Sequence, residues 1–376
     1  MLFNSVNFIL FFPVVFIAYY LIPKKFQYLW LLVTSYFFYM CWNAKYALLL
    51  LASTAVTYIG AILIDWVQAE VNNQGRKDKL KKAVVAVSVL INLGLLCFFK
   101  YGTWLLSNVN HVLHKDYSMP FDIILPVGIS FYIFQALSYT IDVYRGTIEV
   151  ERNFFRYALF VSFFPQLVAG PIERSGNLLE QLRKGHDFCF ENIRYGFLIV
   201  LLGYFEKIVI ADRVAAYVNA VFNNYEAYGA LQLILAILGF SVQIYCDFSG
   251  YSHIAIGTAR MLGIHLMDNF RQPYFATDIK DFWNRWHISL SSWFRDYLYI
   301  PLGGNRCSKI RHYINILVTF LLSGLWHGAA WHFVFWGGIH GIYRVTGEML
   351  KPLRRQIERT NPVRAGGHLV KCFITF

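Results

Sequence analysis

Charge is scarce in this sequence. Only 15% of the 376 residues are Asp, Glu, Lys or Arg, whereas 57% are hydrophobic. Soluble domains carry about a quarter charged residues, so this chain has too few charged side chains to cover a soluble surface. The mean hydropathy of +0.44 and the aromatic content of 18% are typical of a polytopic membrane protein, in which Trp and Tyr lie at the interfaces.

Several common site motifs are also missing. The six cysteines are scattered without a Cys-x-x-Cys pair, which argues against a zinc site and against a disulfide framework. No Walker loop, Gly-x-Gly-x-x-Gly loop, Gly-x-Ser-x-Gly elbow or His-Glu-x-x-His motif occurs, so we expect no metal and no covalent serine. The net charge of +12 comes from basic residues in short loops between apolar runs. The positive-inside rule explains that placement better than nucleic-acid binding, and we expect no nucleic-acid partner.

What the sequence does contain is a succession of apolar runs. They predict an all-α membrane protein of about ten transmembrane or re-entrant helices, forming one domain over residues 1–376. Several runs are shorter than the roughly 20 residues that span a bilayer. Pro165 and Pro171 predict a broken piece, which is tolerated at depth only in protein or beside water. The predicted helices are residues 6–21, 28–42, 46–64, 84–106, 123–142, 157–169, 193–210, 231–245, 314–326 and 331–345.

Loop charges predict the orientation. Basic residues lie at 24–25, at 76–82 and at 145–156, and these loops fall on one side by parity, which makes that side cytoplasmic. The first 21 residues lack a basic n-region and a small-residue cleavage site, so we expect a retained helix rather than a signal peptide. Residues 368–376 form an apolar run too short to span, and we expect a chain shortened at this end.

Residues 282–297 carry the first candidate site. Their spacing predicts one helix with a polar and an aromatic face. Such a helix either lines a substrate path or lies at the headgroups as an amphipathic anchor. The polar stripe is Arg285, Ser289, Ser292 and Asp296, and the aromatic stripe is Phe282, Trp286, Leu290, Trp293 and Tyr297.

His327 is the second candidate. It follows an apolar run long enough to place it well within the bilayer, where ionisable groups are costly and usually functional. Gly324, Gly328 and the two alanines after it leave room for close approach of another segment or a ligand. The imidazole either acts as a general base toward a hydroxyl or is a buried histidine hydrogen-bonded between helices. We expect His332 and His340 to be packing residues.

Six segments of the chain form a recognisable set: MLFNSVNFILFFPVVF (1–16), LPVGISFYIFQALSYTIDVYRG (125–146), FFPQLVAGPIER (163–174), YCDFSGYSHIAIGTARMLGI (245–264), DFWNRWHISLSSWFRDYLYIPLGG (281–304) and SGLWHGAAWHFVFWGGIHG (323–341). In these segments the chain resembles the membrane-bound O-acyltransferase (MBOAT) family, and within it the bacterial branch that O-acetylates extracytoplasmic polysaccharides such as alginate and peptidoglycan. His253 stands where this branch usually has aspartate, and members usually continue for further C-terminal helices.

The resemblance implies tilted helices around a central tunnel in the bacterial cytoplasmic membrane. A cytosolic thioester, expected to be acetyl-CoA, would give its acetyl group there, and a separate extracytoplasmic partner protein would complete polysaccharide modification. D-alanyl or other acyl transfer, or a non-catalytic translocator, remain alternatives. The resemblance assigns catalysis to His327 and His287, and we expect Trp283, Arg285, Trp286, Ser289, Arg295, Asp296 and Trp326 to line the substrate site.

Overall fold

The structure, a computed structural model, describes residues 1–118, 124–168, 170–360 and 372. Within these residues every regular element is a helix, so the all-α prediction is confirmed. The chain divides into two compact units, one formed by residues 1–92 and 127–268, the other by residues 93–126 and 269–376. The prediction of a single domain over 1–376 stays a prediction.

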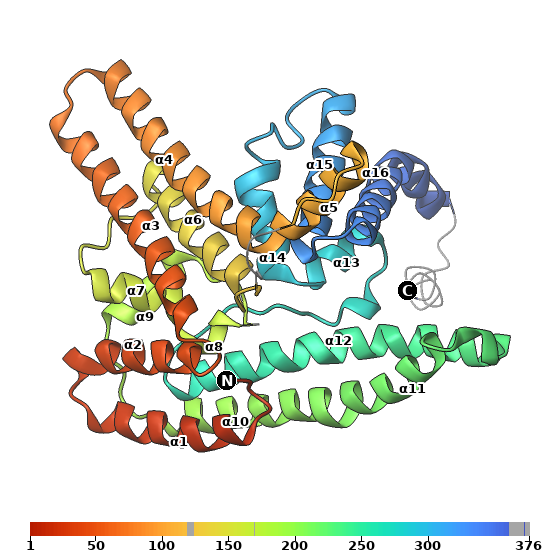
Figure 1. The fold of residues 1–376 in the computed structure, drawn as a ribbon, viewed down its shortest axis with the longest axis horizontal. Coiled ribbons are helices and arrows are strands. Elements are labelled where there is room, and N and C mark those ends of the chain that lie inside the picture. The colour runs from red at the N-terminus through yellow and green to blue at the C-terminus, as the bar shows by residue number, and fades with distance from the viewer. Residues whose placement is uncertain (119–123, 169, 361–371, 373–376) are drawn as a thin grey trace. The chain divides into compact units, whose positions relative to one another are not determined.

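The first unit is built from long apolar helices and several short ones (Figure 1). Its elements are α1 (Val6–Leu21), α2 (Lys24–Met40), α3 (Lys45–Glu70), α4 (Gln74–Leu96), α6 (Ile129–Arg145), α7 (Phe154–Ser162), α8 (Phe164–Leu167), α9 (Ser175–Arg183), α10 (Phe190–Tyr204), the π-helical η2 (Phe205–Ala211), α11 (Asp212–Phe222), the 3₁₀ turn η3 (Tyr225–Ala227) and α12 (Ala230–Met261).

The second unit begins at Leu93, in the last turn of α4, which continues into a π-helical turn. Its elements are η1 (Cys97–Tyr101), α5 (Gly102–Leu113), the 3₁₀ turn η4 (Pro273–Phe275), α13 (Ile279–Arg285), α14 (Ile288–Phe294), the π-helical η5 (Arg295–Tyr299), α15 (Lys309–His327) and α16 (Trp331–Thr360). Helices α15 and α16 form an antiparallel hairpin within this unit (Figure 1).

Three helical runs in the described residues are long and apolar enough to cross a membrane: Lys45–Glu70, the 40-residue run Gln74–Leu113, and Ala230–Met261. Helix α1 is apolar but has only 16 residues. These three runs contain the predicted segments 46–64, 84–106 and 231–245. The count of about ten membrane elements and their arrangement around a tunnel stay predictions.

Several predicted helix boundaries differ from the observed ones. The helix predicted at 123–142 begins only at Ile129, because Gly128 adopts a left-handed backbone with φ of 74° after Pro126; residue 123 lies outside the described part. The run 157–169 is split at Phe163 into α7 and α8. Helix α8 then ends at Leu167, within the predicted broken piece Pro165–Pro171. Ala169 is outside the described residues, as is most of the apolar run 368–376.

Close backbone contacts and polar pairs hold the first unit together. Helices α10 and α12 touch at two glycine pairs, where a Cβ on Gly196 would lie 2.6 Å from the Gly257 carbonyl oxygen and one on Gly203 would lie 2.6 Å from that of Gly250. Small residues at such crossings let membrane helices pack without a hydrophobic driving force. His253, the departure from the family pattern, places Nδ1 2.8 Å from the Glu206 carboxylate. The polar pair at this position is thus formed by a histidine and a glutamate, where the family branch usually has an aspartate at position 253.

Candidate active site

The segment predicted as one helix over 282–297 is three pieces. Helix α13 ends at Arg285, α14 begins at Ile288, and η5 follows as a π-helical turn. The single-helix prediction is wrong because His287 adopts a left-handed backbone with φ of 44°, which ends one helix and redirects the next. The periodic polar and aromatic stripes do not share one continuous helix face.

The break brings His287 into the interior of the second unit. The residue is only 2% exposed. Beyond the break, Ile288 donates its backbone N–H to the Asn269 carbonyl at 2.9 Å, and the Ser289 hydroxyl donates to Oδ1 of Asn269 at 2.6 Å. Ser289, expected to bind substrate, is fully buried and fastens the start of α14 to the preceding loop. This bond holds the backbone beside His287, and a substrate role for Ser289 stays a prediction.

His327 lies at the C-terminal end of α15, close to His287. The centroids of the two imidazole rings are 6.3 Å apart. The His327 ring also contacts the indoles of Trp326 and Trp336, at centroid distances of 5.2 and 5.1 Å. Trp326 contacts His287 in turn, at 5.8 Å. Two histidines that are forty residues apart in the sequence therefore share one aromatic cluster.

The His327 imidazole is held by rings rather than by hydrogen bonds. The side chain is partly exposed, and within the described part of the chain it has ring contacts but no hydrogen-bonding partner. The interpretation of His327 as a histidine hydrogen-bonded between helices is not what the described residues show. Its ring nitrogens are available to a ligand.

Glycines place this histidine against the next helix. A Cβ on Gly324 would lie 2.3 Å from the Phe333 carbonyl oxygen, and a Cβ on Gly337 would lie 2.3 Å from that of Phe320. Helices α15 and α16 therefore approach backbone to backbone one turn before His327. The room predicted at Gly324 is occupied by α16.

Lys100 is a member of the site that the sequence reasoning missed. It lies in the π-helical turn η1, and its ammonium donates a hydrogen bond to the Trp326 carbonyl and sits 5.2 Å from the centroid of the Trp326 ring. Beside it, the Tyr101 hydroxyl donates to the Leu325 carbonyl at 2.8 Å. The two side chains satisfy carbonyls at the end of α15 that lack helical partners. Its position as a lone lysine within the apolar run 84–106 is a sequence signal that could have identified it.

The expected tryptophans are buried in the same unit. Trp283 is 9% exposed, Trp286 8% and Trp326 6%. The Trp283 ring lies 5.8 Å from that of Trp336 and 5.2 Å from that of His340. Its indole Nε1 is buried and has no hydrogen-bond acceptor among the described residues. A buried N–H without a partner is costly, so Trp283 is suited to donate to a ligand or water.

The charged residues expected at the site pair with neighbours in sequence. Arg285 Nε donates to Asp281 at 2.8 Å, one helical turn away, and Arg295 Nε donates to the adjacent Asp296 at 2.8 Å. The Arg295 side chain is 63% exposed. The structure thus brings His287 and His327 together with Trp326 and, through Trp336, with Trp283. It places the two arginines in local ion pairs. In residues 1–118, 124–168, 170–360 and 372, no group of three His, Cys, Asp or Glu residues is arranged to hold a metal ion.

Comparison with known proteins agrees with this architecture. The model of the membrane-bound O-acyltransferase (MBOAT) family matches residues 148–373. The chain is 38% identical to the probable alginate O-acetylase AlgI of Pseudomonas putida over 97% of this chain and 74% of that protein. It is 37% identical to the peptidoglycan O-acetyltransferase of Helicobacter pylori, over 91% of this chain and 69% of that protein.

A more distant relative is the teichoic acid D-alanyltransferase of Bacillus subtilis. It is 29% identical over 59% of this chain and 59% of that protein. The family match includes the whole of the segment that carries His287 and His327. The chain belongs to the membrane-bound O-acyltransferase family and is a membrane acyltransferase.

Proposed function

We propose that this protein transfers an acetyl group from a cytosolic thioester, acetyl-CoA, for the O-acetylation of an extracytoplasmic polysaccharide, with His327 as general base. The observation that carries the proposal is the His327 imidazole, which is partly exposed and has no hydrogen-bonding partner in the described residues. The similarity to an alginate O-acetylase and a peptidoglycan O-acetyltransferase supports acetyl transfer to a polysaccharide.

The chemistry needs one base and one oxyanion donor. A ring nitrogen of His327 takes the proton of the acceptor hydroxyl as its oxygen attacks the thioester carbonyl. The tetrahedral oxyanion collapses, the C–S bond breaks, and the protonated imidazole returns the proton to the thiolate. Trp283 Nε1, buried without an acceptor among the described residues, and His287, 6.3 Å from His327 between ring centroids, are the candidates to stabilise the oxyanion.

The other expected residues lie around these groups. Trp326 contacts His287, and Trp286 packs against Phe270, Tyr274 and Phe282. Ser289 fixes the backbone beside His287 through its bond to Asn269. The final acceptor in this proposal is a polysaccharide outside the bacterial cytoplasmic membrane. A separate extracytoplasmic acetyltransferase completes the transfer of the acetyl group to it. The membrane is the expected surrounding of the apolar spans.

The test is ester-linked acetate in the envelope of cells that express the His327→Ala variant. Loss of a general base lowers the rate about 10²–10⁴-fold, so we expect acetate to fall to background at normal expression. His332→Ala is the matched control, because His332 is an exposed histidine on α16 outside the cluster. Wild-type acetate in His327→Ala would remove the catalytic role and favour a translocator.

A second candidate concerns the cargo. The similarity to a teichoic acid D-alanyltransferase favours D-alanyl transfer on the same scaffold. Membranes are incubated with labelled acetyl-CoA and, separately, with a labelled D-alanyl carrier protein. If label enters the polymer only from the carrier protein, the transferred group is D-alanyl rather than acetyl.

A further inference from the structure

A basic cavity lies in the first unit. It has a volume of about 280 Å³ and is lined by residues from the start of α2, from α7 and from the end of α9 with the loop that follows. Five of its lining residues carry a permanent positive charge: Lys24, Lys25, Arg156, Arg183 and Lys184. None of the described residues that line it is an Asp or a Glu. Such a cavity is suited to an anion.

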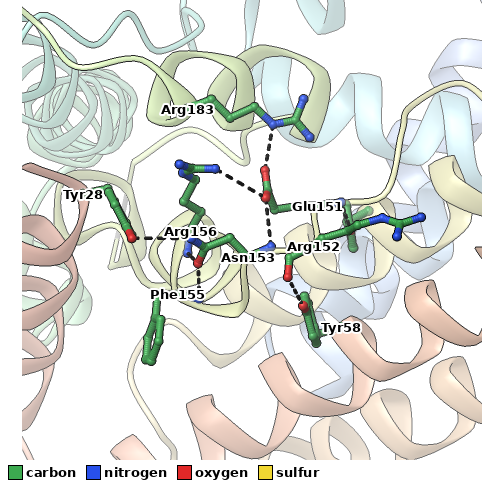
Figure 2. Close-up of polar contacts among 9 residues, drawn as sticks. Tyr28, Tyr58, Glu151, Arg152, Asn153, Phe155, Arg156 and Arg183 are labelled. Carbon is green, nitrogen blue, oxygen red and sulfur yellow. Dashed lines mark hydrogen bonds and ion pairs between the residues drawn. The ribbon is translucent and has the colours of Figure 1, made fainter. Parts of the chain in front are cut away.

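A buried carboxylate behind the cavity orients the two arginines (Figure 2). The Glu151 side chain is 5% exposed and accepts a hydrogen bond from Arg183 Nε at 2.7 Å. The same carboxylate lies 3.8 Å from a terminal nitrogen of Arg156, whose guanidinium also lies over the Tyr28 ring at 5.1 Å. Hydrogen bonding to Glu151 raises the pKa of Arg183. The two guanidinium groups are therefore fixed before any ligand arrives.

The lysines at the rim are less compensated. Lys24 pairs with the exposed Asp187 at 2.6 Å. Lys25 and Lys184 form no ion pair with any residue that the structure describes. Five cations thus face three nearby carboxylates, Glu149, Glu151 and Asp187, and a surplus of positive charge remains at the cavity.

The loop at the edge of the cavity, residues 184–186, is packed against the rest of the unit. The Gln27 side chain accepts from the His186 backbone N–H at 2.9 Å and donates to the His186 carbonyl at 3.1 Å. The Tyr19 hydroxyl lies 3.0 Å from His186 Nδ1. A Cβ on Gly185 would lie 2.3 Å from the Lys24 Cβ, so only glycine allows this loop to lie flush against α2. These contacts give the cavity a defined wall.

The positive-inside rule accounts for basic residues on one side of the membrane but not for their convergence around a cavity with a buried counter-ion. Lys24, Lys25 and Arg156 come from two loops predicted to be cytoplasmic, and the structure places them at one cavity. We propose that this cavity binds a phosphate-bearing anion at the cytoplasmic face, either a soluble phosphate compound or the headgroup of an anionic phospholipid. Lysine and arginine donate charge-assisted hydrogen bonds to phosphate oxygens. The inference does not depend on the catalytic role of His327.

The experiment compares the full chain with the double variant Lys25→Gln/Lys184→Gln. Neither lysine forms an ion pair with a described residue, so we expect the double variant to fold. The control is Lys79→Gln/Lys82→Gln, which removes the same charge from the exposed side of α4, outside the cavity. Inorganic pyrophosphate is titrated into protein in a neutral detergent and binding is measured by calorimetry. In parallel, nanodiscs of phosphatidylglycerol or phosphatidylcholine are analysed by native mass spectrometry for retained lipid.

Because charge-assisted contacts are individually strong, we expect the double variant to weaken pyrophosphate binding at least about tenfold, with the control within about twofold. If pyrophosphate does not bind but the wild type and control retain phosphatidylglycerol that the double variant loses, the ligand is the lipid headgroup. Absence of both binding events in the wild type, or equal binding by all three proteins, would overturn the proposal.

Discussion

Replacing Gly324 by alanine should separate the two helices that position His327. The added Cβ would lie 2.3 Å from the Phe333 carbonyl oxygen and 3.0 Å from the Gly337 Cα. An ordinary carbon–oxygen contact is about 3.3 Å or longer, so α15 and α16 must move apart by about 1 Å. Both neighbours are backbone atoms, which cannot rotate away. Overpacking of this kind costs about 1–3 kcal/mol.

The same displacement reaches the site. His327 is the last residue of α15, and its ring contacts Trp336 of α16 at 5.1 Å. A misplacement of about 1 Å can cost about 10²-fold in rate. We therefore expect Gly324→Ala to lower both the thermal midpoint in nanodiscs, by about 2–4 °C for each kcal/mol, and the ester-linked acetate in the envelope.

Gly338→Ala is the matched control for this prediction. It lies on α16 beside Gly337, and its added Cβ would lie 3.5 Å from Leu321 Cδ2, an ordinary contact. Both variants gain the same helix propensity, so their difference reports the clash alone. Equal midpoints and equal acetate for the two variants would refute the backbone-to-backbone packing of α15 on α16.

Three further variants test other parts of the structure. Glu151→Gln should lower the unfolding free energy by about 1–3 kcal/mol, because it weakens the hydrogen bond to Arg183 behind the basic cavity; an unchanged thermal midpoint would contradict this. Burial lowers the pKa of His186, so this residue binds a proton in the unfolded chain before it does in the folded protein as the pH falls below about 6.5. The stability of the wild type should therefore fall more between pH 7.5 and 5.5 than that of His186→Asn. Parallel stability curves would show that this residue does not contribute. Lys100→Met should reduce acetate transfer about tenfold at normal expression, because the carbonyl of Trp326 loses its donor; full transfer would limit Lys100 to packing.

The sequence predicted the elements whose information is local. Helix α1 occupies the predicted residues 6–21, since a continuous apolar run needs no distant partner to be recognised. The end of α15 at His327 also lies within one residue of the predicted run 314–326, because a glycine follows the apolar residues. The family resemblance rested on contiguous motifs of the same kind, and the comparisons confirm it.

Periodicity failed where a single backbone conformation overrode it. Residues 282–297 have the spacing of one amphipathic helix, yet the left-handed His287 divides them. The two residues between the helices, Trp286 and His287, change the chain direction but leave the i, i+4 spacing of the sequence intact. The pattern therefore carries no trace of the break. Ser289 lay on that predicted face; its hydroxyl donates to Asn269, and its substrate role stays a prediction.

By itself, the amino-acid order determined that this protein is a helical membrane acyltransferase and that His327 ends an apolar helix among small residues. Only the tertiary structure decided that His287 and Lys100 lie beside that histidine's aromatic cluster, and that Lys24, Arg156 and Lys184 line one cavity. The physical reason is that hydrophobic periodicity reports which face of an element is buried, whereas the partner across that face is chosen by packing between segments far apart in the chain.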